Sequence, residues 1–223
     1  MRLDAIMMSK KEIVFRYCLF IIGLFIASLG VAFSTKAGLG TSPVASVPYS
    51  VSLLSTGLTF GGWMNLWSVL QISVQVFLLR KRCKVVEIVI QTILAFVYGY
   101  MTDFSCSLLG NINPNGYVMQ FVVMLIGCVV LAFGIWIQFK GGVAMLSGEA
   151  MNRAISTVTG KKYENVKILF DIIYILVSVA ICMIAFGKLS GVREGSLVAA
   201  VLVGNVIKFY NWIFEKIKTL VKR

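Results

Sequence analysis

The chain lacks histidine altogether and is poor in charged residues, which make up 13% of its 223 positions. The absence of histidine removes the most common general base, proton shuttle and zinc ligand of enzymes. The shortage of charge is equally informative, because soluble domains contain about 25% charged and about 45–50% apolar residues. This chain is 59% hydrophobic, with a mean hydropathy of +0.90. A chain of this length cannot bury so much apolar surface away from water, so its solvent must be lipid.

Motifs for catalysis, metals and cofactors are missing as well. The five cysteines are scattered without a CxxC pair, which favours apolar packing over a disulfide or metal framework. The sequence also contains no phosphate-binding loop and no serine–base motif with a recognisable spacing. We therefore expect no enzyme activity, no metal and no cofactor.

The net charge of +12 points to lipid rather than to nucleic acid. The Lys and Arg residues cluster at the ends of apolar runs, where they set topology and contact anionic lipid headgroups. A nucleic-acid partner is not expected, because no basic stripe with interleaved aromatic residues lies on a polar face.

Six apolar runs are long enough to cross a membrane, which takes about 20 helical residues. These runs are residues 14–35, 62–80, 85–104, 117–138, 165–187 and 195–214. Two other stretches, 42–56 and 147–159, are shorter and more polar. Helices of that length reach no further than about 25 Å, so neither spans comfortably. The sequence therefore predicts an all-α polytopic membrane protein.

The two halves of the chain resemble each other. GVAFSTKAG at residues 30–38 lines up with GIWIQFKGG at residues 134–142, 104 positions later. With small shifts the alignment also pairs Ser42 with Ser147, Ala45 with Ala150, Phe60 with Tyr163, Gly99 with Gly204 and Phe104 with Phe209. Such internal repeats are typical of secondary transporters. The predicted boundaries are a cytoplasmic N-terminus at 1–13, transmembrane repeats at 14–110 and 117–214, and a basic cytoplasmic tail at 215–223.

The positions of Lys and Arg decide between two topologies. If all eight segments cross the membrane, the basic residues divide between both sides. If each short segment enters and leaves on one side, only Lys36, Lys188 and Arg193 lie outside. The positive-inside rule favours the second topology. Each half then has three spans, an odd number, so we expect two inverted repeats, each with three spans and one re-entrant half-helix, and cytoplasmic N- and C-termini.

The first short segment has the features of a broken helix. Gly38 and Gly40 let the backbone leave helical geometry, Ser42 followed by Pro43 predicts a capped helix start, and Pro48 interrupts the helix and frees a carbonyl. Backbone groups freed in lipid need protein, water or a ligand as partner, so we expect this segment to line a wet cavity. Its candidate binding residues are Gly38, Gly40, Thr41, Ser42 and Ser46.

The second short segment repeats these features. Gly141 and Gly142 form the break, and Ser147 followed by Glu149 resembles a second capped start. Glu149 and Arg153 lie four residues apart and can form an ion pair on one helix face. A charge inside a membrane costs at least about 2.5 kcal/mol, so it normally has a partner or a function. We include all five residues in the predicted binding site.

The two half-helices suggest a ligand site, because a helix N-terminus carries a partial positive charge. We expect them to converge on a small polar or anionic solute, with Lys36 and Lys140 raising the positive potential. Alternatively, both lysines extend to opposite membrane interfaces and the breaks serve packing alone. Asp171, and after it Asp103, are the candidates for coupling to a proton or sodium ion, because carboxylates within a bundle can titrate or coordinate an ion.

The first half resembles a known family. Its segments GLFIASLGVAFSTKAGLGTSPVASVPYSVS, STGLTFGGWMNL and GYMTDF are similar to the bacterial YczE/YitT-type (YczE/YyaS/YitT) integral membrane proteins, most closely over GLGTSP at 38–43. The resemblance implies a multi-pass protein of the bacterial inner (plasma) membrane and implies no particular substrate. The chain has Val44 where family members carry an aromatic residue after the Ser-Pro step.

The expected function is that of a small-solute secondary transporter or permease, with its site between the two half-helices. Two alternatives stay open. One is a substrate-capture subunit of a multi-component importer, which co-purification with ATPase subunits would favour. The other is a non-transporting scaffold or regulator, which a dry, filled space between the half-helices would favour. Expected partners are the lipid bilayer and the solute, and the sequence leaves open a homo-oligomer or energising subunits.

Overall fold

The computed structural model describes residues 9–80, 84–188 and 191–221. Residues 1–8, 81–83, 189–190 and 222–223 lie outside the described residues. Most of the predicted N-terminal segment 1–13, the end of the predicted tail, and Cys83 therefore fall outside them.

The described residues fold into eight helices. These are α1 (Lys10–Ala37), α2 (Pro43–Leu54), α3 (Phe60–Leu79), α4 (Val85–Leu108), α5 (Tyr117–Gly141), α6 (Ser147–Thr159), α7 (Tyr163–Phe186) and α8 (Glu194–Val221). Six of them are long and apolar enough to cross a membrane, and the two others, α2 and α6, are the predicted short segments. The predicted all-α polytopic fold is confirmed. The largest difference from the predicted bounds is at the end of α8, which continues to Val221, so the described part of the predicted tail is a helical extension.

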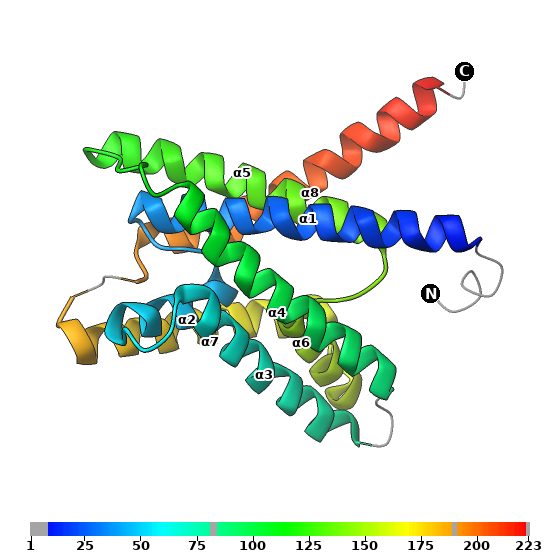
Figure 1. The fold of residues 1–223 in the computed structure, drawn as a ribbon, viewed down its shortest axis with the longest axis horizontal. Coiled ribbons are helices and arrows are strands. Elements are labelled where there is room, and N and C mark those ends of the chain that lie inside the picture. The colour runs from blue at the N-terminus through cyan, green and yellow to red at the C-terminus, as the bar shows by residue number, and fades with distance from the viewer. Residues whose placement is uncertain (1–8, 81–83, 189–190, 222–223) are drawn as a thin grey trace.

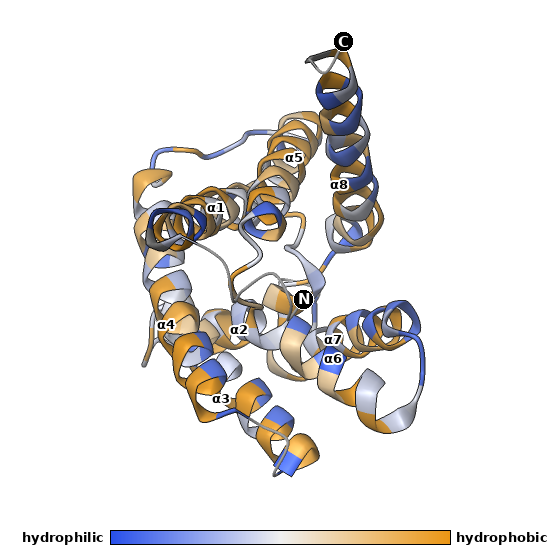
Figure 2. Ribbon diagram, turned by 90° about the vertical axis from the view of Figure 1, so that its right-hand side faces the viewer, coloured by the Kyte–Doolittle hydropathy of each residue, from blue (hydrophilic) through white to orange (hydrophobic). Residues whose placement is uncertain are grey.

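The outer surface of the long helices is apolar. Figure 2 shows hydrophobic residues along the outward faces of α3, α4, α5 and α7. Large side chains on these faces, among them Phe77, Val118 and Ile184, are mostly exposed. Soluble monomers rarely expose contiguous apolar surface on this scale, whereas a bilayer solvates it. The chain is a multi-pass membrane protein.

The two short helices both begin in the middle of the molecule (Figure 1). After α1 the chain turns back toward the middle, and α2 then runs out toward the end of the molecule at which α1 stopped. After α5, which ends at the opposite end of the molecule, the chain also turns back toward the middle. From there α6 runs outward in the direction opposite to α2. The N-terminal ends of the two helices meet, and Gly148 in α6 lies against Val44 in α2.

The long helices α1 and α5 pack antiparallel through glycines. A Cβ atom added to Gly23 would lie 2.8 Å from the carbonyl oxygen of Gly134, and one added to Gly127 would lie 2.9 Å from that of Gly30. Neither position has room for a side chain. Small residues let two membrane helices approach closely and so increase their van der Waals contact. This contact matters because the hydrophobic effect does not drive helices together in lipid. This pair forms the centre of the fold.

The contacts between α1 and α5 are reciprocal. Gly30 rests on the backbone of Leu131, while Gly134 rests on the backbone of Ala27. Gly134 follows Gly30 by 104 positions and Leu131 follows Ala27 by the same number, so each contact is matched by its counterpart. The neighbouring helices follow the same pattern, since α2 packs on α7 and α6 packs on α3.

The non-helical segment between α1 and α2 has largely the structure that its sequence predicts. Gly38 ends α1 with a φ of 70°, and Gly40 has a φ of 104° and pairs with Val192 in an isolated antiparallel bridge. Such positive φ values favour glycine. Ser42 is the N-cap of α2 and Pro43 its first residue, as predicted, but the Ser42 hydroxyl makes no capping hydrogen bond.

The prediction that Pro48 interrupts this helix is wrong, because α2 continues through Pro48 to Leu54. Pro48 still lacks an N–H group, which leaves the carbonyl of Val44 without its helical donor. Val44 lies at the start of the helix, beside the cavity described below.

Candidate functional site

A cavity of about 370 Å³ lies where the two short helices begin. Every helix of the fold contributes to its wall. Its polar and aromatic lining residues are Ser42, Trp67, Ser68, Gln71, Tyr98, Phe139, Ser147, Glu149, Tyr163, Lys167 and Asp171. The rest of the wall is mostly apolar. Ligand sites in proteins commonly combine such an apolar wall with a few convergent polar groups.

The start of α6 is held by a polar chain from α3 and α7. The Ser147 hydroxyl donates to Gln71 Oε1 at 2.8 Å, and Gln71 Nε2 donates to the Tyr174 hydroxyl at 3.2 Å. The prediction that Ser147 caps this helix is wrong, since Leu146 occupies the N-cap position and Ser147 is the first helical residue. The serine hydroxyl instead fixes the half-helix against α3.

One of the predicted polar residues, Asp171, pairs with an unpredicted lysine on α7. Lys167 Nζ lies 3.3 Å from Asp171 Oδ2, one helical turn away. The Asp171 side chain is 18% exposed, and its other oxygen, Oδ1, is buried without a hydrogen-bond partner in the described part of the chain. Asp171 therefore carries one paired oxygen and one unsatisfied oxygen beside the cavity. Its predicted role in ion coupling stays a prediction.

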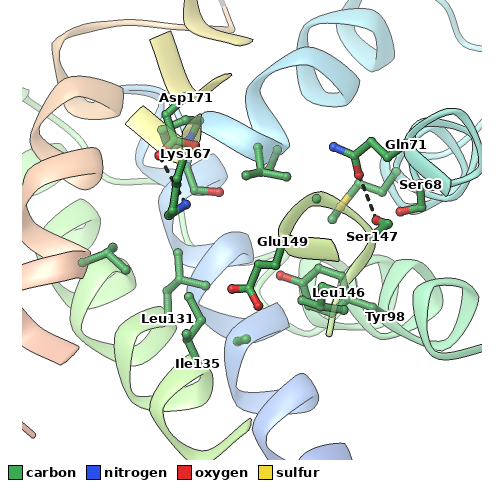
Figure 3. Close-up of a pocket in the computed structure, with 18 of the residues that line it drawn as sticks. Ser68, Gln71, Tyr98, Leu131, Ile135, Leu146, Ser147, Glu149, Lys167 and Asp171 are labelled. Atoms are coloured by element: carbon green, nitrogen blue, oxygen red, sulfur yellow. Dashed lines mark hydrogen bonds and ion pairs between the residues drawn. The ribbon is translucent and has the colours of Figure 1, made fainter. Parts of the chain in front are cut away.

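Glu149 extends from the first turn of α6 into the cavity (Figure 3). Lys167 and Asp171 lie on one side of it and Tyr98 on the other. The predicted ion pair with Arg153 is not formed, because the Arg153 guanidinium turns away and contacts Met145 Sδ at 3.5 Å. Among the described residues, no Lys or Arg nitrogen lies within 4.0 Å of the Glu149 carboxylate.

Asp103 has a different role from Asp171. Its carboxylate accepts hydrogen bonds from the Thr59 hydroxyl at 2.5 Å and from the Gly61 backbone N–H at 2.6 Å. Thr59 is the N-cap of α3, so Asp103 fixes the start of α3 against α4. It is not among the residues that line the cavity.

The remaining predicted residues frame the site rather than line it. Ser46 donates to the carbonyl of Pro43 at 2.7 Å, and the Thr41 hydroxyl is buried with no partner among the described residues. Gly141 and Gly142 end α5 beside Arg16, at the opposite end from Gly38 and Gly40. The structure therefore brings Ser42, Ser147, Glu149 and Asp171 to one cavity and leaves the others around it.

The two lysines next to the breaks do not reach the cavity lining. Lys140 Nζ lies 4.0 Å from the ring centroid of Phe214 and 5.5 Å from that of Trp136. A lysine over aromatic rings at a helix end matches the interfacial alternative considered above.

Sequence reasoning missed several lining residues. On α3, Gln71 follows Trp67 by four positions and Ser68 by three, and on α7 Lys167 precedes Asp171 by four. Those spacings place side chains on one helix face. This signal was available in the sequence, but apolar runs with occasional polar residues are equally typical of helices that only pack against each other.

Fold and site together define a polytopic helical membrane protein with two short helices that meet at a central cavity, whose mostly apolar wall carries a few polar and charged side chains. The chain belongs to the family described as Family of unknown function (DUF6198), whose model matches residues 14–212. This membership, together with the similarity to the proteins YyaS and YczE, confirms the resemblance to YczE/YyaS-type proteins.

Two relatives from Bacillus subtilis (strain 168) are similar to the chain. It is 32% identical to "Uncharacterized protein YyaS" over 128 residues, which cover 56% of this chain and 61% of YyaS. It is 22% identical to "Uncharacterized membrane protein YczE" over 201 residues, which cover 90% of this chain and 87% of YczE. No solved structure matches the chain significantly.

Proposed function

We propose that the protein is a small-solute transporter of the bacterial inner membrane, with the cavity between α2 and α6 as its solute site. One observation carries the proposal: the N-terminal ends of both short helices meet at a cavity that every helix helps to line. Discontinuous helices that meet near the bilayer midplane are the usual setting of solute sites in secondary transporters.

The proposed architecture is a pair of inverted repeats. Two repeats related by a two-fold axis make reciprocal contacts. If a residue of the first repeat contacts a residue of the second, the counterparts of these two residues are also in contact. The contacts of Gly23 with Gly134 and of Gly30 with Gly127 are related in this way, and so is the packing of α2 on α7 and of α6 on α3. The opposite directions of α2 and α6 support inversion (Figure 1).

One departure from this symmetry supports alternating access. α3 packs along α4, whereas α7 and α8, their counterparts, make no comparable contact. At Gly99 in α4 a side chain would overlap Asn65 of α3, but a Cβ atom added to its counterpart Gly204 in α8 would meet no atom of the described residues within 4 Å. Inverted repeats can exchange such conformations, which opens the site to one side and then to the other. We propose that α3 and α4 separate when α7 and α8 close.

The proposed orientation places both termini in the cytoplasm. α1 begins and α8 ends at the same end of the molecule (Figure 1). The positive-inside rule assigns that end to the cytoplasm, because α4 begins and α6 ends there as well (Figure 1), next to Lys84, Lys161 and Lys162 in the sequence.

Two-sided accessibility tests the proposed function. Ser68 lines the cavity, whereas Leu66, on the same helix, is 53% exposed on the outer surface. In a variant with all native cysteines replaced by alanine, Ser68→Cys is exposed to a membrane-impermeant thiol reagent in right-side-out and in inside-out vesicles. Leu66→Cys is the matched control.

We expect Ser68→Cys to react from both sides and Leu66→Cys to react from neither. Reaction from one side only, or from neither, would contradict transport by alternating access. Loss of two-sided labelling together with co-purifying ATPase subunits would instead favour a substrate-capture subunit.

A further inference from the structure

The charges in the cavity come from one half of the protein. Glu149, Lys167 and Asp171 line it, and all three belong to the second half of the chain. The alignment of the two halves places Val44 opposite Glu149 and Ser68 opposite Asp171, and both of these also line the cavity. The first half therefore supplies an uncharged wall, and the second half determines which solute charge the cavity accepts.

These three charges leave one carboxylate without a partner. Lys167 and Asp171 compensate each other at 3.3 Å. Glu149 has no Lys or Arg nitrogen within 4.0 Å among the described residues, and it points into the cavity (Figure 3). An ionised carboxylate in a membrane interior needs a positive partner. The space in front of Glu149 is where a solute would supply one.

The helix ends do not turn the cavity into an anion site. α2 offers few donors, because Pro43 has no N–H group and the N–H of Ala45 already donates to the Ser42 carbonyl at 3.0 Å. The end of α6 has Glu149 in its own first turn, where a carboxylate offsets the positive end of the helix dipole. An anionic solute would therefore approach Glu149, a like charge.

The rest of the wall suits an apolar cation. Rings of Trp67, Tyr98, Phe139 and Tyr163 line the cavity among aliphatic side chains. Aromatic faces attract ammonium groups, and the attraction is stronger where water is excluded. We propose that the solute is an organic amine with an apolar body, whose ammonium group binds Glu149. This inference rests on the proposed transport function and replaces the polar or anionic solute expected from the sequence.

A series of probes of similar shape and different charge tests the inference. The probes are radiolabelled 2-phenylethylamine (cationic), 2-phenylethanol (neutral) and phenylacetate (anionic), measured by equilibrium binding to the full-length protein in nanodiscs. Glu149→Gln removes the charge at nearly constant shape. Glu87→Gln is the matched control, because Glu87 pairs with Lys84 at 3.5 Å on an exposed helix start outside the cavity.

We expect the amine to bind at least about tenfold more tightly than phenylacetate, since hydrogen bonds between charged partners are about twice as strong as neutral ones. Glu149→Gln should weaken amine binding by a similar factor and leave 2-phenylethanol unchanged, while Glu87→Gln should match the parent protein. Phenylacetate binding as tightly as the amine, no binding of the amine, or amine binding unaffected by Glu149→Gln would each overturn the inference.

The labelling of Ser68→Cys in vesicles separates failure of this inference from failure of the proposed function. If Ser68→Cys still reacts from both sides of the membrane, transport stands and only the solute class is wrong. If that two-sided reaction is lost, the transport proposal itself fails.

Discussion

Substitution of Gly30 by alanine tests the packing of α1 on α5. A Cβ atom at Gly30 would overlap the backbone N and Cα of Leu131, so the two helices would have to separate. Inserting a methyl group into a packed core costs about 1–3 kcal/mol. Alanine in place of glycine inside a helix also gains about 0.5–1 kcal/mol through backbone entropy. The expected change in the free energy of unfolding for Gly30→Ala alone is therefore the difference between these two opposing effects.

Comparison with Gly204→Ala isolates the packing cost, because a Cβ atom at Gly204 meets nothing within 4 Å in the part of the chain that the structure describes. Gly204 also lies inside a helix, α8, so this control gains the same backbone entropy without the overlap. We expect Gly30→Ala to be less stable than Gly204→Ala by about 1–3 kcal/mol. Reversible unfolding by sodium dodecyl sulfate in mixed micelles, followed by circular dichroism, measures the difference. Equal stability of the two variants would refute the proposed close contact of α1 and α5.

Two further predictions concern polar residues outside the cavity. Asp103→Ala should lower the free energy of unfolding by about 1.5–3 kcal/mol in the same assay, because Asp103 accepts hydrogen bonds from Thr59 and Gly61 at the start of α3; an unchanged stability would show that these bonds contribute nothing. Lys140→Met should leave binding of 2-phenylethylamine unchanged, since Lys140 lies over Phe214 and Trp136 rather than in the cavity. A change in affinity would mean that Lys140 acts on the site through its charge.

The sequence predicts the helices well because lipid imposes a simple rule. A span must be apolar and about 20 residues long, so hydropathy and length suffice to locate the six long helices. The start of α2 was also predictable, since Ser42 followed by Pro43 is a local signal that needs no tertiary contact.

Features that depend on tertiary contact could not be predicted in the same way. Ser147 and Glu149 look like a helix cap, but Gln71 of a distant helix takes the serine hydroxyl. The Glu149–Arg153 pair is allowed by spacing, yet the arginine contacts Met145 and the carboxylate faces the cavity. Local spacing allows both arrangements, and only the packing of α6 against α3 decides between them.

The contact of α1 with α5 shows the same limit. Gly23 and Gly127 lie in apolar runs, and although Gly23 and Ala27 have the small-xxx-small spacing typical of close helix contacts, that spacing does not identify the partner helix. Their role becomes evident only when the two helices are placed antiparallel and each glycine meets a carbonyl of the other helix.

Disulfide formation across the two equivalent helix pairs tests the central claim most directly. Asn65→Cys with Gly99→Cys joins α3 to α4, which pack in this structure at these two residues. Ile168→Cys with Gly204→Cys places cysteines at the counterpart positions on α7 and α8, where Ile168 is 59% exposed and Gly204 has open space.

If the repeats exchange conformations, both pairs form disulfides under mild oxidation, and each disulfide restricts labelling of Ser68→Cys to one side of the membrane. If only the α3–α4 pair forms a disulfide and the α7–α8 pair never does, the helices do not exchange their arrangement, and the alternating-access account is contradicted.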